Sequence, residues 1–226
     1  MKKVSEKELV LELDQTLRGD LAVPHAPKGL VIFVHGSGSS RRSSRNRYVA
    51  SVLQQRGFAT LLFDLLAESE DADPANRFDI GLLTNRLRAV TAWVRRNAQL
   101  AQMPIAYFGA STGAAAALQA ATEPGSDIFA VVSRGGRPDL AIHDLPYVFA
   151  PTLLIVGGAD HAVIDLNRKA YAMLECPKKL EIVPGATHLF EEPGALEKVA
   201  SLAADWLETQ VTFSEHDKAR GLHAES

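Results

Sequence analysis

The stretch at residues 103–119, MPIAYFGASTGAAAALQ, constrains the fold of this chain more than any other. Residues 105–108 form an apolar run of the length expected for a strand that is buried on both faces. After Gly113 the chain is rich in Ala and Leu, which have high helix propensity. Between them lies G-x-S-x-G. The sequence therefore predicts a strand, a sharp turn and a helix, with Ser111 at the turn.

This arrangement favours a nucleophilic serine. A serine hydroxyl attacks a carbonyl only if it projects beyond the backbone to meet a base and the substrate, and a tight strand-to-helix turn achieves this by holding the residue in a strained conformation. The alternative is a glycine-rich turn with an incidental serine, because G-x-S-x-G often occurs by chance. The strand before and the helix after Ser111 favour a nucleophile elbow. The rest of the chain must then supply an acid, a base and an oxyanion hole.

Length and composition bound the other possibilities. The 226 residues, 46% hydrophobic and 23% charged, suit one sizeable α/β domain. A net charge of −3 gives no general attraction to nucleic acid or an anionic membrane. The single cysteine, Cys176, fits a reducing compartment. Polar residues 5–8 stand where a signal peptide would be apolar, and no apolar run approaches a membrane span, so we expect a cytoplasmic protein.

Hydrophobic patterning predicts alternating strands and helices. Strands are expected at residues 8–13, 17–23, 30–34, 58–63, 105–108, 128–132, 151–156 and 179–183. Helices are expected at residues 48–56, 80–97, 163–174 and 193–207 and after Gly113, with an acidic loop at 68–73. The fold class is α/β: a mostly parallel sheet of about eight strands, helices on both faces, and an antiparallel pair of strands at one edge. Residues 1–210 should form a single domain and residues 211–226 a polar, flexible tail.

In such sheets the chemistry lies beyond the carboxyl ends of the strands. The positions that fall there are residues 35–40, Asp64, Ser111, Arg134, Asp160 and His188. His188 is the candidate general base, against the alternative of a surface-loop histidine. Asp160 is the candidate acid that orients the imidazole, although aspartate also favours helix N-caps. Three other carboxylates are weaker candidates because none ends a strand: Asp165, Glu191 and Glu192.

An oxyanion hole needs two backbone N–H donors. One is expected from Thr112, just after the nucleophile, and the other from Ser37, with Gly38 as second choice. The glycine-rich loop at 35–40 lacks the Gly-Lys-Ser/Thr ending of a P-loop and the third glycine of a dinucleotide fingerprint. His35 is expected to make structural hydrogen bonds, with substrate contact as a secondary expectation.

Basic residues near these loops raise the question of an anionic substrate. Arg41, Arg42, Arg45 and Arg47 either bind an anion or pair with the acidic residues 68–73, and we favour pairing. Arg134 is the better candidate for an anionic substrate, with a structural salt bridge as the equal alternative. No histidine, cysteine and carboxylate cluster has metal-ligand spacing, so neither a metal nor another cofactor is expected. Oligomeric state is not indicated.

Four segments together resemble the α/β-hydrolase superfamily, and within it the small dienelactone-hydrolase-like group. These segments are residues 35–38, 109–113, 151–160 and 185–190, which read HGSG, GASTG, PTLLIVGGAD and GATHLF. The resemblance implies the α/β-hydrolase fold and a catalytic triad of Ser111, Asp160 and His188. Many relatives carry a cap domain after residue 133, but about 17 residues leave no room for one here. Similar domains also occur fused to phosphoribosyltransferase domains, which makes a partner domain conceivable.

The sequence therefore predicts a cofactor-independent serine hydrolase that cleaves small carboxylic esters or lactones through an acyl-enzyme on Ser111. Dienelactone hydrolases proper use a cysteine nucleophile, so dienelactone itself is not the expected substrate. Thioesterase or perhydrolase chemistry would use the same residues. The alternative from another class is a non-catalytic binding module that keeps the fold.

Overall fold

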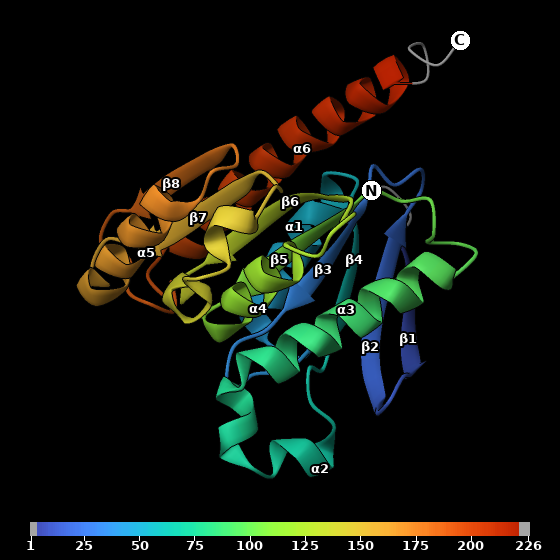
Figure 1. Ribbon diagram of the computed structural model, residues 1–226, viewed down its shortest axis with the longest axis horizontal. Helices are drawn as coiled ribbons and strands as arrows, with labels where there is room; N and C mark the ends of the chain where they lie inside the picture. The colour runs from blue at the N-terminus through green and yellow to red at the C-terminus, as the bar shows by residue number, and fades with distance from the viewer. Residues whose placement is uncertain (1–3, 222–226) are drawn as a thin grey trace.

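A single eight-stranded sheet organises the computed structural model, which describes residues 4–221, with side chains to Phe213. The strands lie in the order β1-β2-β4-β3-β5-β6-β7-β8 (Figure 1). Their bounds are β1 Val4–Glu12, β2 Thr16–Pro24, β3 Leu30–Val34, β4 Ala59–Phe63, β5 Ile105–Ala110, β6 Ile128–Arg134, β7 Thr152–Gly157 and β8 Lys178–Val183. Only the pairings of β2 with β1 and with β4 are antiparallel. The predicted α/β-hydrolase sheet and its antiparallel edge are confirmed.

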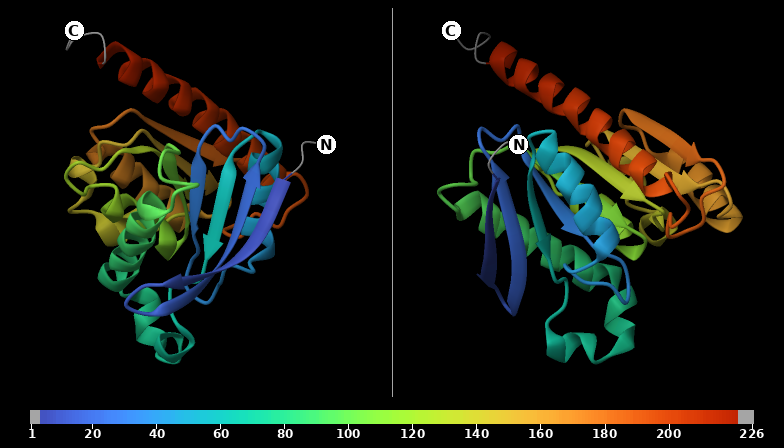
Figure 2. Two further views of the ribbon diagram at one scale, coloured as in Figure 1. Left: turned by 90° about the vertical axis from the view of Figure 1, so that its right-hand side faces the viewer. Right: turned by 180° about the vertical axis from the view of Figure 1, so that it is seen from behind.

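Within residues 4–221, six α-helices and three short 3₁₀ helices lie between the strands or follow the last one. Their bounds are α1 Ser44–Gln55, α2 Glu68–Asp71, η1 Pro74–Phe78, α3 Ile80–Arg96, α4 Thr112–Ala120, η2 Pro138–Ala141, η3 Leu145–Tyr147, α5 His161–Met173 and α6 Ala195–Gly221. Helix α1 packs against α6, and both cover one face of the sheet. Helices α3, α4 and α5 lie on the other face, and the views from the side and from behind separate the two layers (Figure 2).

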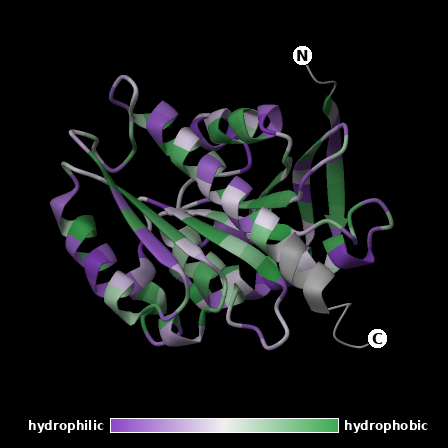
Figure 3. Ribbon diagram, turned by 90° about the horizontal axis from the view of Figure 1, so that it is seen from above, coloured by the Kyte–Doolittle hydropathy of each residue, from purple (hydrophilic) through white to green (hydrophobic). Residues whose placement is uncertain are grey.

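The central strands are apolar because both of their faces are covered. Every residue of β3, β4, β5, β6 and β7 is buried, whereas the edge strands β1 and β8 are mostly exposed or half-buried. Helix α4 is almost wholly buried, whereas the other long helices carry apolar residues toward the sheet and polar residues toward solvent (Figure 3). Burial on both faces fixes the parallel strands in register, and their carboxyl ends meet along one edge.

Two segments differ from the sequence prediction. The acidic stretch 68–73 is not simply a loop, because it contains α2, and η1 follows it. The last helix was predicted to end at Leu207, and this is wrong, because α6 continues to Gly221 and still buries Val211. A helical segment therefore occupies residues 211–221, where a polar tail was expected, and residues 222–226 lie outside the described residues.

No cap covers the carboxyl edge of the sheet between β6 and β7, where only η2 and η3 interrupt the loop. Within residues 4–221, none of the helices is both long enough and apolar enough to cross a lipid bilayer.

Candidate active site

Ser111 stands at the turn between β5 and α4 with a φ of 51° and a ψ of −122°, a strained conformation for a residue with a Cβ. The turn is tight because the first residues of α4 lie against the backbone at the end of β3. A Cβ on Gly113 would lie 2.2 Å from the carbonyl oxygen of Val34, so only glycine fits. The Ser111 N–H donates to the Arg134 carbonyl (3.2 Å), and its carbonyl accepts from the Arg137 N–H (3.1 Å). These bonds hold the strained residue in place.

His188 and Asp160 lie beside each other beyond β8 and β7. The Nδ1 of His188 is 2.7 Å from Oδ2 of Asp160, and the two side chains are 38% and 16% exposed. Asp160 occupies the N-cap position of α5 but makes no side-chain capping bond there. Its carboxylate is therefore bonded to the imidazole rather than to the helix, which is the geometry expected of an orienting acid.

Gly135 connects the serine to the histidine. It follows Arg134, which binds the Ser111 N–H, and a Cβ on Gly135 would lie 3.6 Å from Cε1 of His188. Its φ of 52° is left-handed, so glycine suits this contact on two grounds. The structure thus brings Ser111, Asp160 and His188 to one place at the carboxyl edge of the sheet.

The weaker carboxylate candidates have other partners. Glu192 accepts from the hydroxyl (2.6 Å) and the N–H (3.1 Å) of Thr187, and these bonds lower its pKa. Glu191 pairs with Arg45 at 3.0 Å. Asp165 lies 3.4 Å from Arg168 on α5. Glu192 braces the residue before His188, a role that sequence reasoning missed because a carboxylate in a polar loop gives no distinguishing pattern.

The two residues predicted to form the oxyanion hole lie in contact. The Ser37 N–H donates to Oγ1 of Thr112 at 2.9 Å, and Thr112 is buried. The loop after β3 and the start of α4 are therefore joined, as an oxyanion hole requires. In this structure, however, the Ser37 amide already has an acceptor. Gly38, the second choice, has a φ of 66° and open space around its α-carbon.

His35 has a structural position. The Leu65 N–H donates to its Nε2 (3.1 Å), so Nδ1 carries the proton and donates to the Gly36 carbonyl (3.0 Å). Burial lowers the pKa of the ring, which favours the neutral form. Both nitrogens are engaged by backbone, which leaves neither for a substrate. The expected structural hydrogen bonds are present, and the geometry offers no support for substrate contact.

Arg134 is a buried cation without a carboxylate partner among the described residues. It is 7% exposed, its Nε has no partner there, and its Nη2 reaches Oδ1 of Asn46 only at 3.4 Å. The guanidinium lies over the ring of Phe190 (5.9 Å), near Arg45. Burial, together with the charge of Arg45, lowers the pKa of Arg134 to about 10. The structural salt bridge that was its alternative explanation is not formed.

The other arginines do not pair as expected. We predicted that the cluster at 41–47 would bind the acidic residues 68–73, and this is wrong. Arg41 instead turns to the antiparallel edge, where its partners are Glu8, Asp20 and Asp64. The acidic segment has its own arginines: Asp71 binds Arg77 and Glu70 binds Arg86. Charge alone did not specify these partners, because several carboxylates compete for each arginine.

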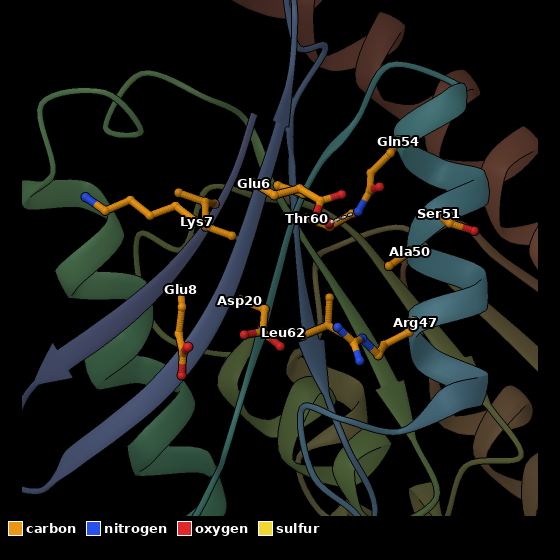
Figure 4. Close-up of a pocket in the computed structure, with 12 residues that line it drawn as sticks. Glu6, Lys7, Glu8, Asp20, Arg47, Ala50, Ser51, Gln54, Thr60 and Leu62 are labelled. Carbon is orange, nitrogen blue, oxygen red and sulfur yellow. Dashed lines mark hydrogen bonds between the residues drawn. The ribbon is translucent and has the colours of Figure 1, made fainter. Parts of the chain in front are cut away.

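Several clefts among the described residues lie away from Ser111, Asp160 and His188. One, of about 320 Å³, lies between α1 and the β1–β2 edge and is lined by Glu6, Asp20, Arg47 and Thr60, among others (Figure 4). A second, of about 430 Å³, lies between the loops that follow β3 and β4. Within the described residues, no group of three or more histidine, cysteine and carboxylate side chains could hold a metal ion.

This fold and this site define the class of the protein as an α/β hydrolase. Residues 17–217 match the dienelactone hydrolase family, and the chain belongs to that family of hydrolases.

Two solved structures and a curated relative are similar to this chain. A crystal structure of dienelactone hydrolase from Anabaena variabilis is 51% identical, with a TM-score of 0.89, and the match covers 92% of this chain and 98% of that one. Est1E from Butyrivibrio proteoclasticus shares the fold with a TM-score of 0.78 at 17% identity, over 91% of this chain and 99% of Est1E. A Mycobacterium tuberculosis protein with the name "Putative phosphoribosyl transferase" is 60% identical over 188 residues. That match covers 83% of this chain but only 42% of the relative, so the chain spans less than half of that protein.

Proposed function

We propose that the chain is a serine hydrolase of small carboxylic esters or lactones, with Ser111 as nucleophile, His188 as base and Asp160 as orienting acid. One observation carries the proposal: the segment 134–137 binds the strained serine through Arg134 and Arg137, and at Gly135 it lies against the carboxylate-bonded histidine. A serine without a catalytic role would gain nothing from a conformation that costs about 1–3 kcal/mol.

The reaction follows from this arrangement. His188 Nε2 takes the proton of the Ser111 hydroxyl as Oγ attacks the carbonyl carbon, while Asp160 stabilises the imidazolium through Nδ1. The negative oxygen of the tetrahedral intermediate is stabilised by the Thr112 amide and a second amide from residues 37–38. His188 then gives its proton to the leaving alkoxide. A water molecule, deprotonated by the same ring, attacks the acyl-enzyme, and Ser111 recovers its proton as the acid leaves.

The surroundings of Arg134 favour a substrate that carries a negative charge. A buried, unpaired guanidinium is costly for the fold, and an anionic group that binds it would remove that cost. Arg134 is the last residue of β6, the strand that pairs with β5, and β5 leads to Ser111. The Arg134 carbonyl accepts a hydrogen bond from the Ser111 N–H. We therefore propose carboxylated esters as preferred substrates over neutral ones of equal length.

The proposal is tested by covalent labelling together with ester turnover. Intact-mass measurement with a fluorophosphonate should show one adduct on the wild-type protein, and short p-nitrophenyl esters should be hydrolysed. Ser111→Ala and His188→Ala should each abolish both signals. If the wild-type protein takes no label and hydrolyses esters no faster than Ser111→Ala, the protein is a binding module instead.

A matched pair of variants tests the acid. Asp160→Asn should lower kcat at least about 1,000-fold, because the amide favours the wrong tautomer of His188. Asp165→Asn changes a carboxylate five residues further along the same helix that pairs only with Arg168, and should leave kcat within about twofold. Equal losses in both variants would exclude Asp160 as the orienting acid.

A further inference from the structure

Residues 134–137 run from the last residue of β6 to the N-cap of η2, and their backbone holds Ser111 by hydrogen bonds. They bind Ser111 on both sides: Arg134 accepts from its N–H and Arg137 donates to its carbonyl. A non-glycine residue at positive φ persists only where its surroundings over-determine it. The position of Ser111 therefore depends on where this segment lies.

The same segment supports the base and its acid. A Cβ on Gly135 would lie 3.2 Å from the carbonyl oxygen and 3.6 Å from Cε1 of His188, so the backbone at Gly135 lies close to the histidine. The Gly135 N–H donates to the carbonyl of Ile155 in β7 (2.8 Å), the strand that leads to Asp160. A displacement of residues 134–137 would thus change the distance between the nucleophile and the His188–Asp160 pair.

Asn167 is the side chain that fixes this segment from helix α5. It is fully buried (0% exposed), and its Nδ2 donates to the Gly136 carbonyl at 3.0 Å and to the Val163 carbonyl at 2.9 Å. Asp160 is the N-cap residue of the same helix, about two turns before Asn167. Helix α5 lies beside β7 and β8 at one end of the sheet (Figure 1). It therefore carries Asp160 at its N-terminus and, further along, Asn167, which binds the segment that holds Ser111.

A purely structural role explains Asn167 poorly. Asparagine has low helix propensity, and burial of its amide is costly unless every polar atom is bonded. Its Oδ1 is buried without a partner among the described residues, so the side chain is not fully satisfied. An apolar residue of similar size would fill the position at less cost. An apolar residue would lose the bond to the Val163 carbonyl within α5 and the bond to Gly136, and only the latter connects the helix to the 134–137 segment.

We propose that Asn167 is a positioning residue that sets Ser111 against His188 and Asp160 by fixing the Gly136 carbonyl. The inference rests on the proposed hydrolase function. Asn167 acts through the 134–137 segment and does not itself touch the substrate.

The test compares Asn167→Leu with the wild-type protein. Leucine keeps the γ-branched shape of asparagine but cannot donate to Gly136. We expect kcat for a p-nitrophenyl ester and the rate of fluorophosphonate labelling to fall together by about 10–100-fold, because small misplacements of reacting groups have effects of this size. KM should change less than about threefold, because no substrate contact is lost. A merely structural residue would lower the melting temperature but not the labelling rate of the folded protein.

Thr84→Val is the matched control. Thr84 is also buried and donates a side-chain hydrogen bond, to Gln119, but it joins α3 to α4 away from the segment. The Thr84→Val protein should be less stable than the wild-type protein, but its kcat and its rate of fluorophosphonate labelling should be unchanged. Asn167→Ser provides the second variant if leucine prevents folding, and it should show the same loss. Folded Asn167 variants that label at the wild-type rate would overturn the positioning role, whereas a wild-type protein that never labels would overturn the hydrolase function itself.

Discussion

Three arginines whose side chains the structure describes are more than nine-tenths buried, and their surroundings differ. Arg41 has carboxylate oxygens of Glu8, Asp20 and Asp64 within 3.6 Å, and Arg86 binds Asp14 and Glu70. Removal of either arginine would leave its carboxylate partners without a counter-charge. Arg134 has no such partner among the described residues, so its charge is a burden on the fold. A residue that lowers stability is retained where it serves binding or catalysis.

Arg134→Met should therefore make the protein more stable and less selective. We expect the free energy of unfolding to rise by about 1–3 kcal/mol, because replacement of a poorly compensated buried charge by an apolar side chain is favourable. KM for a p-nitrophenyl half-ester of succinate should rise at least about tenfold, with little change for p-nitrophenyl butyrate. Urea unfolding and steady-state kinetics measure the two effects.

Arg168→Met controls for the loss of a positive charge, since Arg168 is largely exposed and pairs only with Asp165. It should change neither stability by more than about 0.5 kcal/mol nor the preference between the two esters. If Arg134→Met is less stable than the wild-type protein and equally selective, Arg134 supports the fold and does not bind an anionic group.

At the scale of elements, the sequence predicts the features that depend on neighbouring residues, such as strands, turns and the ends of strands. The glycines around Ser111 and the apolar runs before Asp160 and His188 predict strands that end where chemistry can occur, and the structure places all three residues at one edge. The edge pair β1–β2 followed from alternation and a polar turn. These features depend on periodicity and turn residues within a few positions.

Long-range partners could not be predicted in this way. The bonds of Arg41 to the β1–β2 edge and of Asn167 to Gly136 depend on which of several equivalent groups the fold brings together. The length of α6 was missed because a polar helix beyond Leu207 lacks the apolar periodicity that marks a helix against a core. The sequence therefore left two things unpredicted: the contacts between elements, and the polar helical segments that have no apolar side.

The bond between Ser37 and Thr112 is one such contact, and it joins the β3 loop to helix α4. Thr112→Val keeps the side-chain shape but removes the acceptor of the Ser37 N–H. We expect a loss of about 1–2 kcal/mol in the free energy of unfolding and a roughly tenfold lower kcat, because the loop amide is no longer held beside the Thr112 amide. Thr112→Ser retains the hydroxyl and should restore both. A higher kcat in the valine variant would show instead that the hydroxyl competes with the substrate for the Ser37 amide.

At the scale of the whole molecule, three groups make stability depend on pH in the same direction. The pKa of Glu8 is lowered by its bond to Arg41, and that of Glu192 by its bonds to Thr187. A carboxylate with a lowered pKa stabilises the fold above its unfolded pKa, and this stability is lost as pH falls through the folded value. The pKa of His35 is lowered by burial, against weaker opposite effects of Gly36, Asp64 and Asp71.

His35 should produce the first stage of acid destabilisation. The unfolded chain binds a proton on this ring near pH 6.5, whereas the folded protein keeps it neutral to a lower pH. Stability is therefore fully present above about pH 7 and declines as pH falls below about 6.5, before the carboxylates contribute. Melting temperatures of the wild-type protein and His35→Gln, measured from pH 8 to pH 4.5, test this. The glutamine variant should be less stable at pH 8 because its hydrogen bonds to Gly36 and Leu65 are imperfect, yet it should lose less between pH 7 and pH 5 than the wild type does. Parallel curves over that interval would mean that the ring is protonated equally in both states, and that acid acts on this protein through its carboxylates alone.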